Sequence, residues 1–127
     1  MANATELATN LGVTEITVYN ACTATLARGS RIYRTSSGYL LSPDATTRGD
    51  AITTQDIPTL TYGAACLPTQ GCIGVVIDGN VSDGVLVYAS TTAGQCSPTS
   101  TNAQLMGRAK MTGANTQLIT IELMTNA

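Results

Sequence analysis

The sequence predicts an all-β protein, a small β-sandwich or barrel-like single domain, from three observations. First, one pattern occurs twice: an apolar residue leads to Gly29, a short strand-like segment ends in Tyr33 and a small polar run follows, and the same order returns at Gly84 and Tyr88, 55 residues later. Second, several segments alternate apolar and polar residues, which is typical of half-buried strands. Third, no segment carries an apolar stripe at the helical period of about 3.6 residues.

The first half is expected to begin with a strand at residues 15–19, where apolar and polar side chains alternate. Residues 31–34 and 39–41 are predicted to pair as a hairpin, because the Ser-Ser-Gly between them suits a tight turn. Residues 46–56 are polar around one isoleucine and are expected to form a loop with a short edge strand. A further alternating strand is predicted at residues 59–62.

In the second half, residues 73–77 form a β-branched run that we expect to be buried on both faces or to lie at a subunit contact. Residues 85–88 and 105–111 are predicted strands, the latter interrupted by a glycine, and the polar residues 90–103 between them are expected to form a surface loop. The last strand, at residues 117–124, alternates. It carries Ile119, Ile121 and Leu123 on one face and Leu118, Thr120 and Glu122 on the other.

Residues 1–14 contain few large apolar side chains and are expected to form an extended N-terminal arm. The rest of the chain, residues 15–127, is then one β domain. The repeated pattern divides this domain into two weakly similar halves at about residues 16–65 and 70–124.

The composition excludes several classes of function. Charged residues make up 11% of the chain and the net charge is -2, so no basic surface exists to bind nucleic acid. No apolar run approaches the roughly 20 residues that cross a bilayer, so no membrane contact is expected. The absence of His removes every nucleophile that relies on imidazole, and the absence of Trp and Phe removes the usual aromatic platforms for sugars. We therefore predict a protein without enzymatic activity, cofactor or metal.

The four cysteines form no Cys-x-x-Cys pair, and no histidine is present to complete a mixed zinc site. Buried free thiols are the simplest interpretation of Cys22, Cys66, Cys72 and Cys96. A disulfide between Cys66 and Cys72 is the alternative, because these two residues could close a short loop if its arms run antiparallel.

Three of the six cations, Arg28, Arg31 and Arg34, cluster at a spacing of three residues. Along an extended chain this spacing does not place them on one face. We expect them to lie on a solvated edge or to form salt bridges at an interface.

Several short motifs follow one another in a fixed order: Val18-Tyr19-Asn20, Leu26-x-x-Gly29-x-x-Ile32-Tyr33, Ile73-Gly74-Val75-Val76, Asp83-Gly84-x-x-Val87-Tyr88, Leu105-Met106-Gly107-Arg108-Ala109 and Leu118-Ile119-Thr120-Ile121-Glu122-Leu123. This order resembles the small capsid decoration, or cement, proteins of tailed bacteriophages. The resemblance covers roughly residues 16–124, while the cysteines and residues 90–103 lie outside its pattern.

The resemblance implies a compact β-fold, commonly a homotrimer, on the outer surface of an icosahedral phage head after synthesis in the host cytoplasm. Its partner would be the major capsid protein, whose neighbouring subunits it clamps, with a terminal arm laid across one of them as an added strand. On that basis Leu7, Leu11 and Val13 are predicted to contact the capsid. Two alternatives lack catalytic groups as well: a phage tail or other virion structural subunit, and a non-catalytic carbohydrate-binding β module.

Overall fold

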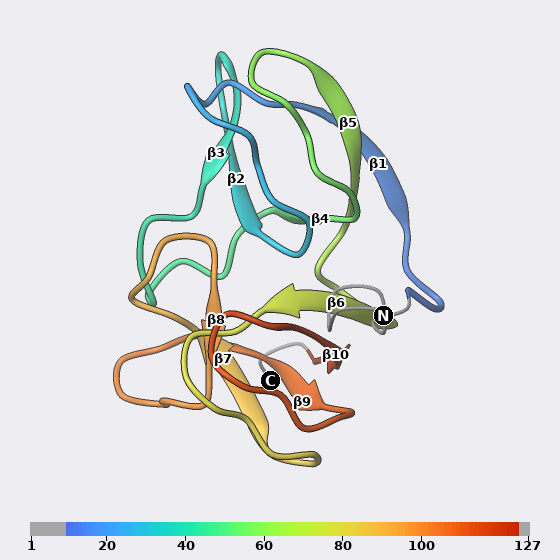
Figure 1. Ribbon diagram of the computed structural model, residues 1–127. Helices are drawn as coiled ribbons and strands as arrows, with labels where there is room; N and C mark the ends of the chain where they lie inside the picture. The colour runs from blue at the N-terminus through green and yellow to red at the C-terminus, as the bar shows by residue number, and fades with distance from the viewer. Residues whose placement is uncertain (1–9, 125–127) are drawn as a thin grey trace.

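The computed structural model describes residues 10–124, and over this range the chain folds into two five-stranded antiparallel sheets without a helix (Figure 1). The predicted all-β class is confirmed. Among the described residues, no helix is long and apolar enough to cross a membrane. The strands of the first half are β1 (Glu15–Tyr19), β2 (Arg31–Thr35), β3 (Gly38–Leu41), β4 (Ala51–Thr53) and β5 (Tyr62–Cys66). Those of the second half are β6 (Cys72–Val76), β7 (Leu86–Ala89), β8 (Cys96–Ser97), β9 (Leu105–Ala109) and β10 (Leu118–Leu123).

The two sheets share one topology. The strand order is β1-β5-β4-β2-β3 in the first and β6-β10-β9-β7-β8 in the second, so each strand of the first half has a counterpart five strands later. Each sheet also curls until its two edges meet at one end. Parallel bridges join Asn20 to Tyr39 in the first sheet and Ile77 to Cys96 in the second. The chain is therefore built from two copies of one curled β unit, which lie one above the other in Figure 1.

The repeated sequence pattern marks equivalent places in these two units. Gly29 and Gly84 each end the turn that leads into β2 or β7, with φ angles of 84° and 88°. Residues with a Cβ atom rarely adopt such angles, which explains glycine at both places. Tyr33 and Tyr88 are both half-buried on the strands that follow. The prediction that the two copies of the pattern form strands entered from equivalent turns is confirmed.

Each unit has an aliphatic core. The core of the second half also includes Ile52 and Cys66 from the first half, so apolar packing is continuous across the boundary between the units. The first core consists of Val18, Leu26, Ile32, Ala51, Ile57 and Ala65. The second is built mainly from Ile73, Val75, Ile77, Val81, Val87, Ala89, Met106, Ile119, Ile121 and Leu123.

Two strands of the first half lie elsewhere than predicted. β4 is a central strand between β5 and β2 rather than an edge strand, and all three of its residues are buried. Thr53 is buried because its hydroxyl donates a 2.8 Å hydrogen bond to the carbonyl oxygen of Ala27. A polar sequence pattern does not reveal this long-range hydrogen bond. The predicted strand at residues 59–62 is mostly turn, and β5 begins only at Tyr62.

Residues 90–103 are only in part the surface loop that their polar composition predicts: residues 91–93 and 98–102 are exposed, but the rest of the segment is buried or half-buried. β8 lies within this segment and pairs with β7, and the connection between these strands packs onto the first half. There the Arg31 amide donates to the Gly94 carbonyl oxygen at 2.8 Å, and the Gly94 amide donates to that of Ser42 at 2.8 Å. Hydrogen bonds between the halves therefore hold this segment on the first half.

The outward face of β10 is also more buried than its alternation predicts. Ile119, Ile121 and Leu123 are buried as expected, but Leu118 on the other face is only 2% exposed. The turn of the first half packs over it, so closely that a Cβ atom on Gly29 would lie 2.3 Å from Leu118 Cδ1. A contact between the two units therefore covers a position that would face solvent in one unit alone.

The disulfide considered between Cys66 and Cys72 does not form, and all four cysteines are free thiols. Cys66 ends β5 opposite Glu15 in the first sheet, whereas Cys72 begins β6 opposite Glu122 in the second. The short connection therefore crosses between sheets and its arms do not pair as a hairpin. Burial raises the pKa of the Cys66 thiol to about 11, and burial likewise raises that of Cys96 to about 11.

Candidate functional site

Arg31 joins the two halves, and of the two settings predicted for it, a solvated edge or an interface salt bridge, the solvated edge is wrong. Its side chain is fully buried on β2. The spacing of the arginines in the sequence did not indicate the backbone acceptors that surround it. The guanidinium donates to the backbone carbonyl oxygens of Gln95 at 2.7 Å, Ser90 at 3.1 Å and Asp44 at 3.4 Å, and also to that of Thr47. Burial lowers the pKa of this guanidinium. The residue acts as a structural link rather than as a surface cation.

The outer edge of β6 is covered by two other parts of the chain. The N-terminal residues of the described chain cover the start of this edge, and the turn that precedes β2 covers its end. Three amides of the strand donate outward to these segments: Cys72 to the Leu11 carbonyl oxygen at 2.7 Å, Gly74 to Asn10 Oδ1 at 3.4 Å and Val76 to the Gly29 carbonyl oxygen at 3.1 Å. All three outward amides of the β6 edge thus have partners within the chain.

The equivalent edge of β1 meets β3 at its end, where Asn20 bridges to Tyr39, but among the described residues no N-terminal segment and no turn of the other unit covers it. The Thr14 carbonyl and the Asn20 amide bond toward the β5 side, so by alternation the amides of Glu15, Thr17 and Tyr19 point to the other side. Within residues 10–124 the structure gives these three amides no partner, and the Glu15 and Thr17 side chains are exposed. An edge of this kind can accept a strand or a turn from another chain.

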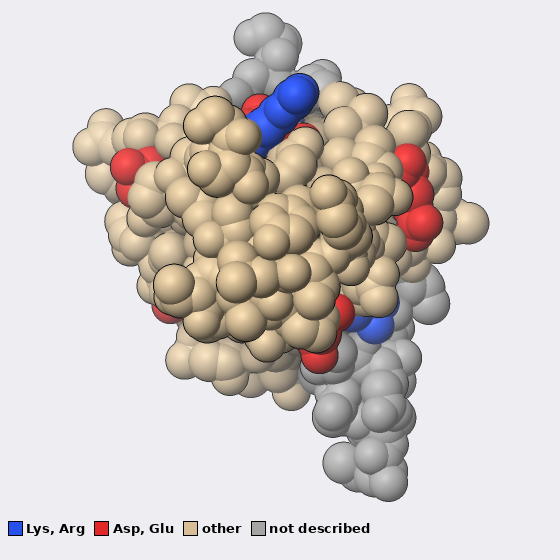
Figure 2. Space-filling model, turned by 90° about the horizontal axis from the view of Figure 1, so that it is seen from above, with Lys and Arg blue, Asp and Glu red and all other residues tan. Residues whose placement is uncertain are grey.

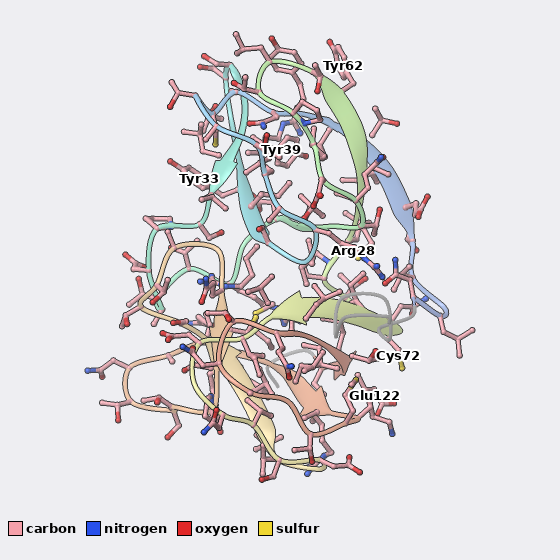
Figure 3. All side chains as sticks on the ribbon, viewed as in Figure 1. Arg28, Tyr33, Tyr39, Tyr62, Cys72 and Glu122 are labelled. Atoms are coloured by element: carbon pink, nitrogen blue, oxygen red, sulfur yellow. The ribbon has the colours of Figure 1, made fainter. Side chains whose placement is uncertain are left out.

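An apolar surface adjoins the β1 edge. Tyr62 is 73% exposed and Leu60 is 62% exposed, and the Tyr62 ring lies 4.9 Å from that of Tyr19 between centroids, at 58°. Figure 3 places Tyr62 at the far end of the first half. Figure 2 views this end from above and shows charged side chains only toward its rim, in keeping with the absence of any charged residue from 57 to 77. We call Tyr19, Leu60 and Tyr62 the tyrosine surface.

Of the three residues predicted to contact a capsid, Leu7 lies outside the described residues. Leu11 has a 72% exposed side chain, although its backbone pairs with Cys72. Val13 is half-buried and packs against the core of the second half. Residues 10–14 were expected to form part of an extended arm, but in the structure they pack on the folded domain. Their contact with a capsid stays a prediction.

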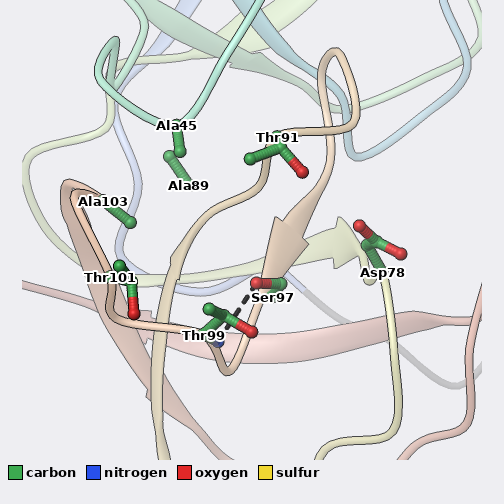
Figure 4. A pocket seen from close by; sticks show the side chains of 8 residues that line it. All are labelled: Ala45, Asp78, Ala89, Thr91, Ser97, Thr99, Thr101 and Ala103. Carbon is green, nitrogen blue, oxygen red and sulfur yellow. Dashed lines mark hydrogen bonds between the residues drawn. The ribbon is translucent and has the colours of Figure 1, made fainter.

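A pocket of about 200 Å³ lies beside β8 (Figure 4). Its wall is rich in hydroxyl groups, of which Ser97 Oγ accepts from the Thr99 amide at 3.1 Å. The Asp78 carboxylate in the wall accepts from the hydroxyls of Ser90 and Thr92. Those two hydrogen bonds lower the pKa of Asp78. No aromatic ring stands among the residues that line the pocket, so a sugar would find no platform there. The lining residues are Ala45, Asp78, Ala89, Thr91, Ser97, Thr99, Thr101 and Ala103.

In the part of the chain that the structure describes, no three Cys, Asp or Glu side chains lie together in a group that could hold a metal ion.

Comparison with known proteins bears on the fold. The chain is similar to the head fiber gp8.5 N base in bacteriophage phi29, with a TM-score of 0.66 over 87% of this chain and 94% of that chain. The two sequences are 12% identical, so the likeness shows a shared fold. No family model matches the chain, and no curated protein matches it by sequence.

The sequence offers five tyrosines, at positions 19, 33, 39, 62 and 88, as parts of a binding platform, but it did not mark Tyr19, Leu60 and Tyr62 as one surface and gave no sign of the β1 edge. The sequence did contain a difference between the two halves, because β5 begins with Tyr62 and its counterpart β10 begins with Leu118. Only the shared topology makes these positions comparable. The exposed ring of Tyr62 and the buried side chain of Leu118 then indicate that the first position is uncovered and the second is covered.

Proposed function

We propose that this chain is a non-enzymatic structural protein of a bacteriophage virion, which binds the outside of the head as a homotrimer and stabilises contacts between major capsid protein subunits. The observation that carries the proposal is the fold, which matches the base of a phage head fiber over nearly the whole of both chains. The order of motifs that resembles capsid decoration proteins supports the same class of function.

The chemistry of the side chains also favours a structural role. The chain has no histidine, and its single lysine, Lys110, is exposed and lies 4.0 Å from Glu122. An exposed lysine beside a carboxylate is not a desolvated nucleophile. In the pocket beside β8, the Asp78 carboxylate and the Ser97 hydroxyl are hydrogen-bonded within the protein.

The same likeness favours a second candidate, in which the chain forms the base of a head fiber. Both candidates place the protein on the head. They differ in what electron microscopy of the particle would show, which is a low cap in the first and the foot of a projecting fiber in the second.

Localisation in the particle tests the proposed function. Heads and tails of the phage that encodes the chain would be separated and analysed by mass spectrometry, and the head would be imaged by cryo-electron microscopy. We expect the chain in the head fraction, with density on the outer surface over contacts between capsid subunits. Recovery with tails, or from host cytosol only, would contradict the proposal.

Attachment through the N-terminal segment is tested separately with capsids that lack the protein. Because residues 10–14 are part of the folded body, the deletion should cover residues 2–9 only. We expect it to weaken binding at least tenfold, or about 1.4 kcal/mol. A control that replaces residues 2–9 with glycine and serine separates the effect of sequence from that of length. Binding as tight as that of the full chain would exclude this mode of attachment.

A further inference from the structure

The contact between the two units of one chain supplies a template for a contact between chains. Inside the chain, the turn before β2 rests on the edge of β6: Val76 donates its amide to the Gly29 carbonyl oxygen, and Leu118 lies beneath the turn. This contact joins a turn on one unit to an edge on the other, so it is not symmetric. Each unit therefore possesses both a turn and an edge, and the internal contact uses only one of each.

The unused turn belongs to the second half. Gly84 is the counterpart of Gly29 and has nearly the same φ, but a Cβ atom placed on it would meet nothing within 4 Å. The residues around it, from 82 to 85, are all exposed, and Val85 shows 37% of its apolar side chain. The Gly84 carbonyl oxygen accepts one hydrogen bond, from Arg108 at 2.7 Å, and has a second lone pair available.

The unused edge belongs to the first half. Tyr19 is the counterpart of Val76, because both end the first strand of their unit. Tyr62 pairs with Tyr19 and Leu118 pairs with Val76, so Tyr62 is the counterpart of Leu118. Leu118 is buried under the internal turn, whereas Tyr62 is 73% exposed. The outward Tyr19 amide has no partner among the described residues, just where Val76 has one.

We propose that the chain binds a second copy of itself by repeating its internal contact: the turn at residues 82–85 of one copy docks on the β1 edge and the tyrosine surface of the next. In this contact the Gly84 carbonyl oxygen accepts from the Tyr19 amide, and Val85 packs near the Tyr62 ring. The two surfaces lie at opposite ends of the chain, with the turn at the bottom of Figure 1 and Tyr62 at the top of Figure 3, so they meet between copies rather than within one.

A contact that joins different surfaces generates a closed ring or an open filament. A ring of three copies would be the homotrimer of the proposed function, and the ring size rests on that proposal. The contact itself rests on the duplicated fold alone. It can be tested in solution without a capsid, so its failure is distinguishable from failure to bind the head.

Self-association would be measured by sedimentation velocity on the full chain over a range of concentrations. Tyr62→Lys and Val85→Lys each place a charge in the proposed contact at an exposed position, and each should weaken association at least tenfold without loss of the folded CD spectrum. Thr101→Lys, at an exposed position outside the contact, is the matched control and should associate like the unmodified chain. An unmodified chain that stays monomeric at all concentrations would overturn the proposal.

Mixing the two charged variants tests the asymmetry of the contact. Tyr62→Lys keeps an intact turn and Val85→Lys keeps an intact edge, so an equimolar mixture should form one-to-one pairs although neither variant associates alone. A mixture that remains monomeric would count against a contact between turn and edge.

Cross-linking identifies the partner segment directly. Benzoylphenylalanine in place of Tyr62 should cross-link, on irradiation, to a peptide that contains residues 82–85 of another copy. Cross-linking to residues 58–62 of the other copy would reveal a symmetric contact and overturn the proposal. The same probe in place of Tyr33 is the control and should not reach residues 82–85.

Discussion

Arg31 donates a 3.1 Å hydrogen bond to the carbonyl oxygen of Ser90, a residue of the other half that lies 59 positions later in the chain. The same guanidinium reaches Gln95 in that half and the connection between β3 and β4 in its own. A planar group with five donors can hold several carbonyl oxygens at once, which no aliphatic side chain can do. The link between the two units is therefore polar at this point, although apolar packing also crosses the boundary at Ile52 and Cys66.

Removal of this guanidinium should destabilise the chain strongly. Arg31→Met keeps most of the volume but leaves the bonded carbonyl oxygens without a donor in a buried place, so we expect the free energy of unfolding in urea to fall by at least about 3 kcal/mol. Arg34→Met on the same strand is the matched control. That side chain is exposed, and its loss should change stability by no more than about 0.5 kcal/mol. Similar effects of the two substitutions would show that Arg31 is not a structural link.

The two equivalent turn glycines should respond differently to alanine. Gly84→Ala introduces only the strain of a left-handed backbone, about 1–2 kcal/mol. Gly29→Ala has the same strain and also places a Cβ atom 3.0 Å from the Gly74 carbonyl oxygen and 2.3 Å from Leu118 Cδ1. The additional cost should be about 1–3 kcal/mol. Urea denaturation of dilute protein would measure both, and equal losses would refute the close packing at Gly29.

Much of the fold was accessible from sequence because strands that face a core on one side alternate. The strands at β1, at the hairpin of β2 and β3 and at β10 were predicted close to their observed limits. The repeat around Gly29 and Gly84 also marked equivalent turns, since a positive φ calls for glycine at each. Both signals are local, because each depends only on residues that are close together in the sequence.

The remainder depended on contacts between distant residues. β4 is central and buried although it has three residues and a threonine among them, because the Thr53 hydroxyl bonds to the Ala27 carbonyl oxygen. Arg31 is buried because four carbonyl oxygens converge on it from two segments, the connection between β3 and β4 and the connection between β7 and β8. The tyrosine surface became recognisable only when the topology showed that Tyr62 and Leu118 are counterparts. No window of sequence contains that information.

The buried thiols should make stability depend on pH in the alkaline range. Cys66 and Cys96 ionise near pH 9 when the chain is unfolded, whereas burial raises their pKa to about 11 in the folded chain. Between these values the unfolded state binds fewer protons, so stability falls as pH rises from 9 to 11. The slope should reach up to about 1.4 kcal/mol per pH unit for each thiol.

Urea denaturation with reductant at several pH values would measure this loss. A Cys66→Ala and Cys96→Ala double variant should lose most of the slope. An unchanged slope in the double variant would assign the pH dependence to groups other than the thiols.

Leu11 and Val13 should separate attachment from folding. Val13 is half-buried against the second core, so Val13→Ala should lower the free energy of unfolding by about 1 kcal/mol. Leu11 is 72% exposed and holds β6 through its backbone only, so Leu11→Ala should leave stability within about 0.5 kcal/mol of the unmodified chain. If the exposed leucine contacts a capsid subunit, Leu11→Ala should nevertheless weaken binding to undecorated capsids severalfold. Unchanged binding together with unchanged stability would remove Leu11 from the attachment surface.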